Sequence, residues 1–297
     1  MSNENENENS SLTDEIKKEI VDYDTLILSG GSVKGFLMLG AIQYLIDNYY
    51  LNNVKTFIGT SGGAIINYLL ILGLTPIEIM VYICTNQLIE RLQHFNIIAM
   101  INGNGALSFS SIYEQLEKMT IEKIGFLPTF LDLKERFNKE LICTTFNLSE
   151  NKIEYISSEN YPNMPVLIAL KMSSNLPLIF ENFKYNNSFY IDGGVADNFP
   201  LDLGIEKGNK IIGLYIGNEI NNFNNFVLDE MNIIEYIYKL MFIPIAQTIS
   251  QKVDKNKDKC KIIKLVNRNI TFFSFNINSV DKLNLFSEGY KQCKEQI

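Results

Sequence analysis

A serine on a tight turn is the strongest chemical signal in the chain. The apolar residues Val54, Phe57 and Ile58 predict a short buried strand, and an apolar helical pattern begins just after Ser61. The sequence G-T-S-G-G at 59–63 therefore places G-x-S-x-G on a strand–turn–helix, where the serine hydroxyl would project from a strained elbow. Gly59 and Gly63 stand where a Cβ would crowd that turn. A glycine-rich turn with a capping serine would look the same, so a nucleophile is one of two readings.

A second glycine-rich loop precedes this turn. Residues 25–29 predict a buried strand, G-G-S-V-K-G follows at 30–35, and apolar residues then recur at helical spacing. Such a loop can cradle a phosphate or direct backbone N–H groups at a developing oxyanion. The phosphate motifs fit poorly, because the G-K-[ST] ending is absent and Ser32 replaces the second glycine of G-x-G-x-x-G. The glycines could also simply allow close helix–strand packing, and Lys34 could be an ordinary surface lysine.

A serine nucleophile needs a base within hydrogen-bond reach, and a histidine is a poor candidate here. The chain has one histidine, His94, which falls in a stretch that reads as a loop. Glu78 and Glu90, the acidic residues between Ser61 and His94, lie within predicted helices rather than at a strand end. The Ser-Asp-His order of the α/β-hydrolases is therefore disfavoured.

A carboxylate is the alternative base. Asp192 ends an apolar strand at about 189–191 and precedes Gly193 and Gly194. A carboxylate in this position projects from the end of a sheet, where α/β proteins form their ligand sites. Asp192 could equally initiate an Asp-Gly turn.

The elements that would position these residues alternate between strands and helices, which predicts an α/β fold with a largely parallel central sheet. Further helices are predicted at about 62–73, 76–92, 110–124, 130–137, 165–174, 227–252 and 279–295, and further strands at about 141–146, 152–157, 211–216 and 260–266.

Composition limits the classes of function. The chain has 297 residues, 46% hydrophobic content and a net charge of −8, which argues against nucleic acid as a partner and against a broad electrostatic hold on anionic lipid. The N-terminus lacks the features of a secretory signal, and the four cysteines form no C-x-x-C pair, so we expect an intracellular protein, cytoplasmic or peripheral to a membrane. Residues 68–85 are apolar, but Thr75-Pro76 interrupts them, so we expect two core helices rather than a transmembrane span.

Four segments stand in an order typical of one enzyme family. The loop at 30–35 is followed by the serine turn at 59–63, by S-S-N-L-P-L-I-F at 173–180, and by D-G-G at 192–194 with N-F-P at 198–200. Each is weak alone, but together they are specific. In these segments the chain resembles the patatin-like phospholipases.

The resemblance implies a three-layer α/β sandwich and a lipid acyl hydrolase that uses a Ser-Asp dyad without histidine. Ser61 would be the nucleophile and Asp192 the base, and the N–H groups of Gly31 and Ser32, with Gly30, would form the oxyanion hole. No cofactor or metal is implied. Supporting roles in the same motifs would fall to Lys34, Gly35, Gly59, Gly63, Gly193 and Gly194.

One residue departs from the family pattern. The family's loop usually begins with three glycines, and Ser32 occupies the third position here. If the loop requires a positive φ there, serine would be strained by about 1 kcal/mol, although its backbone N–H survives. Lys34 matches a basic position in the family that could hold anionic groups.

The resemblance covers about residues 24–217. Before it, we expect an acidic disordered tail at 1–22, with a short amphipathic turn at 12–20, and after it an α/β extension at 218–297 packed on the same domain. The expected partner is a phospholipid or another lipid ester, with peripheral membrane contact. Nothing in the sequence decides whether a protein partner is needed.

Two other functions remain open: a catalytically inactive lipid-binding module of the same fold, which Ser32 keeps under consideration, and a small-ester carboxylesterase. A lipid substrate needs an apolar entrance, and residues 95–101 and 236–245 are candidates for a lid or acyl groove. Core packing of amphipathic helices is the plainer explanation of both stretches.

Overall fold

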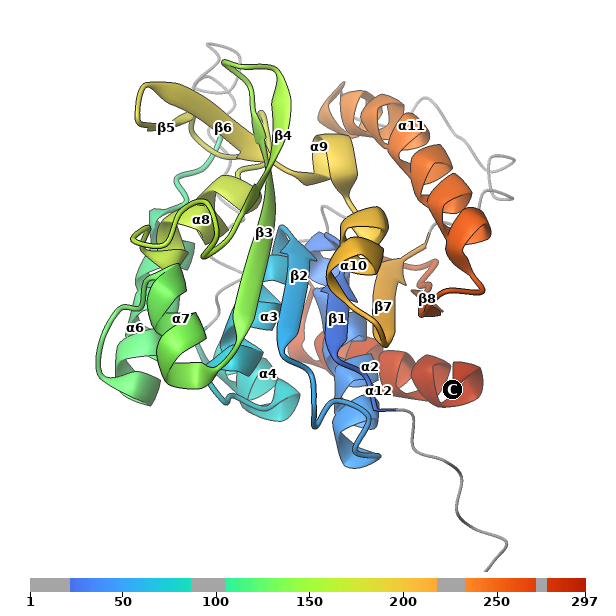
Figure 1. Ribbon diagram of the computed structural model, residues 1–297. Coiled ribbons are helices and arrows are strands. Elements are labelled where there is room, and N and C mark those ends of the chain that lie inside the picture. The colour runs from blue at the N-terminus through green and yellow to red at the C-terminus, as the bar shows by residue number, and fades with distance from the viewer. Residues whose placement is uncertain (1–21, 87–104, 218–232, 271–276) are drawn as a thin grey trace, which may run out of the picture.

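A central β-sheet organises the protein in this computed structural model, which describes residues 22–86, 105–217, 233–270 and 277–297 (Figure 1). The eight strands are β1 (Thr25–Leu28), β2 (Thr56–Thr60), β3 (Glu140–Asn147), β4 (Lys152–Ile156), β5 (Phe183–Tyr185), β6 (Ser188–Asp192), β7 (Ile211–Ile216) and β8 (Lys261–Leu265). Pairing follows the order β5-β6-β3-β2-β1-β7-β8, and β4 also pairs with β3. The pairs among β3, β2, β1, β7 and β8 are parallel, whereas β4, β5 and β6 pair antiparallel.

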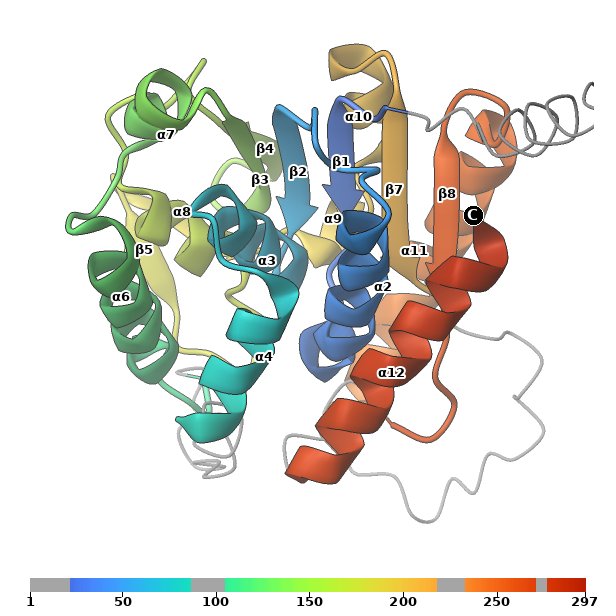
Figure 2. The same ribbon diagram turned by 90° about the horizontal axis from the view of Figure 1, so that it is seen from below.

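Helices cover both faces of the sheet. They are a 3₁₀ turn η1 (Ser32–Lys34), α2 (Gly35–Asp47), α3 (Gly62–Ile71), α4 (Pro76–Thr85), α6 (Ser110–Ile124), α7 (Phe130–Phe137), α8 (Val166–Ser173), α9 (Gly194–Asp197), α10 (Leu201–Lys207), α11 (Ile233–Asn256) and α12 (Ser279–Gln296). Figure 2 shows α2, α3, α4 and α12 together on one side of the strands. Residues of α10 and α11 pack in a second core on the other side. The result is the mixed α/β sandwich with a mostly parallel sheet that the sequence predicts.

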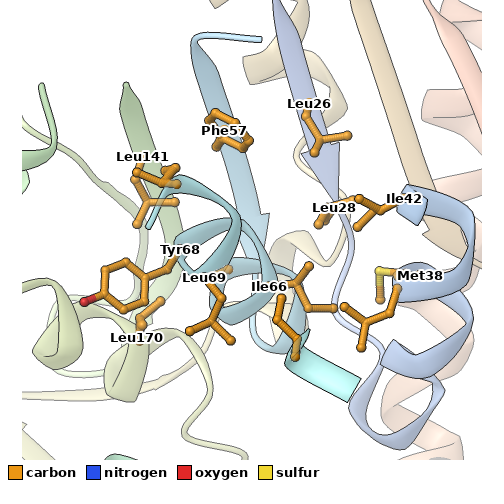
Figure 3. Packing of buried hydrophobic residues seen from close by; sticks show 14 of the residues in the cluster. Leu26, Leu28, Met38, Ile42, Phe57, Ile66, Tyr68, Leu69, Leu141 and Leu170 are labelled. Atoms are coloured by element: carbon orange, nitrogen blue, oxygen red, sulfur yellow. The ribbon is translucent and has the colours of Figure 1, made fainter. Parts of the chain in front are cut away.

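Alternation along the central strands creates the two cores. Leu26 and Leu28 of β1 belong to the core beneath α2 and α3, whereas Ile27 between them belongs to the core beneath α10 and α11. Successive side chains of a strand point to opposite faces, so a fully apolar strand must be buried on both. Figure 3 shows Met38 and Ile42 of α2 packed beside Leu28 in the first core.

The predicted helix pair at 68–85 forms as expected. Thr75 caps α4, and its side chain and that of Glu78 form a reciprocal capping box, with Pro76 in the first turn. α3 and α4 are bent by 117° relative to each other. Within the described ranges, no single helix is long and apolar enough to cross a membrane. Only α3 and α4 taken together, a bent pair, have the required length and composition.

The extension after residue 217 adds to both the sheet and one helical layer. β8 pairs in parallel with β7, and α12 packs along α2. Gly40 of α2 and Gly289 of α12 bring the two helices into backbone contact, because a Cβ at either position would collide with a carbonyl group of the other helix.

Most predicted elements are confirmed, with four omissions. η1, β5, α9 and α10 are short, and the sequence patterns did not predict them. β5 and β6 form a hairpin whose turn residues, Asn186 and Asn187, both have positive φ, as a primed hairpin turn requires. The Asn-Asn pair was thus an available turn signal. The acidic tail with its turn at 12–20, His94 and the candidate lid at 95–101 lie outside the described residues, except for Asp22 at the end of the tail.

Candidate active site

Ser61 occupies the sharp turn between β2 and α3. Its backbone has φ 54° and ψ −126°, a combination that a residue with a Cβ rarely adopts. The Ser61 carbonyl accepts the first helical hydrogen bonds, from the N–H groups of Ala64 at 2.9 Å and Ile65 at 3.2 Å. Strain of this kind costs on the order of 1–3 kcal/mol and persists only where the surrounding structure imposes it. The geometry is that of the strained elbow predicted from G-x-S-x-G.

Two glycines allow the elbow to pack. A Cβ on Gly59 would lie 2.6 Å from the backbone nitrogen of Ala64, on the other arm of the turn. A Cβ on Gly63 would lie 2.5 Å from the carbonyl oxygen of Ser29, at the start of the glycine loop. Backbone atoms cannot move aside as a side-chain tip can, so these positions hold strand, helix and glycine loop together.

The register of β3 brings Asp192 to the serine. Thr144 and Thr145 both pair with β4 along one edge of β3. On the opposite edge, Thr144 pairs with Thr60 at the end of β2, and Thr145 pairs with Asp192 at the end of β6. β2 is parallel to β3 and β6 is antiparallel, so the two strands run toward each other along one edge. Their carboxyl ends meet there, and Ser61 follows Thr60 directly.

Asp192 is almost fully buried, with 1% of its surface exposed. Its Oδ1 accepts the Gly194 N–H at 2.6 Å. Burial raises the pKa of Asp192 to about 7, although interactions with the Ser61 hydroxyl and the Gly194 N–H act in the opposite direction. Oδ2 is buried and has no hydrogen bond to any residue that the structure describes. Hydrogen bonds between catalytic groups often form fully only when substrate binds.

The glycine loop crosses above the serine. A Cβ on Gly30 would lie 3.3 Å from the Ser61 Cβ, so the loop backbone lies against the serine side chain. The Gly30 N–H donates to the Asn198 carbonyl at 3.1 Å, so this N–H already has a partner within the protein. Ser32 has φ 46°, in the left-handed region. The positive φ considered for this position is therefore present.

A narrow pocket joins these elements. Its cavity volume is about 30 Å³, and α11 forms one wall with the side chains of Tyr238, Met241, Phe242 and Ile245. Residues on this face of α11 are half-buried or buried. The pocket is lined by Gly30, Gly31, Ser32, Ser61, Leu176, Asp192, Gly194, Val195, Asn198 and these four residues of α11.

Comparison with known proteins places this chain in a family. The model of the patatin-like phospholipases matches residues 26–205, more than half of the chain. The chain belongs to the patatin-like phospholipase family. Over 194 residues it is 39% identical to "Probable lipid hydrolase 463L" of Invertebrate iridescent virus 6, a match that covers 63% of this chain. The chain spans 65% of the length of that relative.

Two further likenesses extend beyond the matched region. Protein R571 of Acanthamoeba polyphaga mimivirus is 30% identical over 281 residues, which cover 92% of this chain and 93% of that protein. The crystal structure of VipD from Legionella pneumophila superposes with a TM-score of 0.53 at 15% identity, covering 93% of this chain and 66% of that one. The structural likeness extends the shared fold to the C-terminal part of this patatin-like chain.

Lys34 is not the surface residue that one reading of the sequence allows. It is 5% exposed, and its Nζ donates to the Asn267 carbonyl at 2.9 Å. Burial lowers the pKa of Lys34, although the nearby Glu288 acts to raise it. Lys34 does not line the pocket; it fastens the glycine loop to the segment after β8. Gly35 begins α2 with an ordinary helical φ, and no neighbour lies close enough to exclude a Cβ there.

The end of α8 supports both halves of the site, a role that the sequence analysis did not assign. The Ser173 hydroxyl accepts the Ser61 N–H at 2.9 Å, and the Ser173 carbonyl accepts the Gly193 N–H at 3.4 Å. Two residues later, the Asn175 carbonyl accepts the Asp192 N–H at 2.9 Å. The available signal was the polar S-S-N run after an apolar helix. Gly193 itself packs against the Thr144 carbonyl, where a Cβ would not fit.

Proposed function

We propose that this protein is a lipid acyl hydrolase of the phospholipase A or lysophospholipase type, in which Ser61 is the nucleophile and Asp192 its base. One observation carries the proposal: Ser61 and Asp192 come from distant segments yet line one pocket beneath the glycine loop. The raised pKa of Asp192 adds to it, since a base works best when its pKa is near the working pH.

The proposed reaction has two steps. Asp192 accepts the Ser61 proton as the serine oxygen attacks the ester carbonyl, and the proton passes to the departing alcohol as the acyl-enzyme forms. Water then attacks the acyl-enzyme, Asp192 takes a proton from that water, and the fatty acid leaves as Ser61 regains its hydrogen. The N–H groups of Gly31 and Ser32 would stabilise the oxyanion in both steps.

The two faces of α11 support a lipid rather than a small polar ester as substrate. Tyr238 and Phe242 belong to the face that lines the pocket. Tyr236, Leu240 and Ile243 lie on the opposite face at i, i+4 and i+7, and each is at least 41% exposed. We infer that the exposed face contacts the membrane surface while the other contacts the acyl chain. A salt bridge joins the C-terminal half of α11 to α9: the Lys252 ammonium donates to the Asp197 carboxylate at 2.8 Å.

Hydrolysis of phospholipid vesicles and of short-chain p-nitrophenyl esters tests this proposal. Wild-type protein should release fatty acid from phospholipid, and Ser61→Ala and Asp192→Asn should each abolish turnover while thermal unfolding shows an intact fold. Activity retained in either variant would remove the dyad. Vesicle binding without hydrolysis or fluorophosphonate labelling would indicate an inactive lipid-binding module. Turnover of short esters alone would indicate a carboxylesterase.

A further inference from the structure

A second pocket adjoins the proposed acyl site. It has a cavity volume of about 70 Å³ and shares Asn198, Phe242 and Ile245 with the first pocket. Its remaining lining comes from the ends of β7 and β8 and from the next turns of α11: Tyr215, Ile216, Gly217, Ala246, Ile249, Ser250 and Lys264. The ends of β7 and β8 are the carboxyl ends of parallel strands, where α/β sheets bind ligands.

The charges of the two pockets are opposite. Among the described residues, Asp192 is the one carboxylate that lines the first pocket, and Lys264 is the one charged side chain that lines the second. The Lys264 ammonium makes no ion pair or hydrogen bond with the part of the chain that the structure describes. Lys264 lies in the extension beyond residue 205, where the family match ends. The second pocket therefore presents a cation beside the first, on an element outside the matched region.

The position of Lys264 in β8 directs its side chain to the second pocket. Lys264 and Ile262 lie on the face of β8 that turns to α11, whereas Ile263 and Leu265 belong to the core on the other face. Gln296 fixes the lysine backbone, accepting its N–H at 3.0 Å and donating to its carbonyl at 3.0 Å. The lysine stem crosses Gly217, where a Cβ would collide with the Lys264 Cε.

We propose that this second pocket, through Lys264, binds the phosphodiester of a glycerophospholipid whose ester carbonyl lies at Ser61. The inference rests on the proposed function and specifies its substrate class. The phosphate of such a lipid is only a few bonds from its ester carbonyls, so two adjoining pockets can hold both groups of one molecule. A lysine ammonium is a suitable point charge for a phosphate oxygen. A neutral acylglycerol would leave the lysine without its ligand.

Two substrates with the same acyl chains, both presented in the same detergent micelles, test the proposal: diheptanoylphosphatidylcholine and diheptanoylglycerol. Lys264→Gln should lower kcat/KM for the phospholipid about tenfold or more, the loss expected for a charge-assisted hydrogen bond, and leave the value for the diacylglycerol unchanged. Lys264→Arg should restore most of the loss. Lys261→Gln is the matched control, because it removes the same charge from the other face of the same strand. An equal loss with both lipids, or no loss with either, would overturn the proposal.

A binding measurement separates this inference from the proposed hydrolase activity. Calorimetric titration of Ser61→Ala with diheptanoylphosphatidylcholine needs no turnover. Binding that weakens about tenfold in Ser61→Ala/Lys264→Gln supports the phosphate site even if the wild-type protein hydrolyses nothing. Binding that Lys264→Gln does not change, in a protein whose wild type hydrolyses the lipid, would overturn the phosphate site and leave the hydrolase proposal intact.

Discussion

The pH dependence of Ser61 reactivity follows from the burial of Asp192. Burial raises the pKa of this carboxyl to about 7, from an ordinary value of 3.8. Only the ionised carboxylate can accept the serine proton, so the rate should rise tenfold for each pH unit below 7 and level off above it. Between pH 5 and pH 8 the rise should be roughly 100-fold.

Labelling by a fluorophosphonate probe measures this rate without a lipid interface. Second-order labelling rates are recorded from pH 5 to pH 9 at constant ionic strength. Besides Asp192, His94 is the one side chain whose ordinary pKa lies between pH 5 and pH 8, where the rise is expected, so His94→Gln should give the same rise over this range. A rate that is flat from pH 5 to pH 8 would refute the buried-base reasoning. So would a profile that becomes flat in His94→Gln.

The same pKa has a consequence for stability. A carboxyl whose pKa is raised on folding contributes stability that is fully present below pH 4 and is lost as the pH rises to about 7. The difference between about 7 and 3.8 corresponds to about 4 kcal/mol. Asp192→Asn keeps the shape without the charge, so it should unfold at a higher urea concentration than wild type at pH 8. The gap should shrink toward pH 4; a less stable variant at pH 8 would contradict this account.

Three further predictions concern the surroundings of the dyad. Ser173→Ala should leave the Ser61 N–H unpaired and lower kcat about tenfold with little change in KM. The control Ser174→Ala removes a buried hydroxyl with no partner among the described residues and should leave kcat unchanged. Equal kcat values for the two variants would exclude the positioning role of Ser173. Ser32→Gly should relieve left-handed strain and raise the free energy of unfolding by up to about 1 kcal/mol, measured by urea titration, and a destabilised variant would contradict the strain. Leu240→Ser combined with Ile243→Ser should weaken vesicle co-sedimentation several-fold without slowing short-ester hydrolysis, and unchanged sedimentation would remove the membrane face of α11.

Local patterns predicted much of the architecture. The apolar runs that end at glycine predicted β1 and β2, and helical spacing after each predicted α2 and α3. The elbow at Ser61 was readable because few residues besides glycine fit around such a turn. These features depend on residues that are close together in the sequence.

The proximity of Ser61 and Asp192 could not be predicted from local patterns. Ser61 and Asp192 meet because β2 and β6 share one edge of β3, and that register is set by pairing between distant strands. The pKa of Asp192 depends on the helices and loops that bury it, and the hydrogen bond from Ser61 to Ser173 joins residues far apart in the sequence. Propensity and periodicity carry no information about any of these contacts.

Trapping the acyl-enzyme tests the central proposal most directly. The protein is mixed with a slowly hydrolysed p-nitrophenyl ester of a fatty acid, quenched in acid and digested for mass spectrometry. The peptide that contains Ser61 should carry the mass of the acyl group, and the adduct should be absent in Ser61→Ala. Ester hydrolysis with no adduct on Ser61, or an undiminished rate in Ser61→Ala, would contradict it.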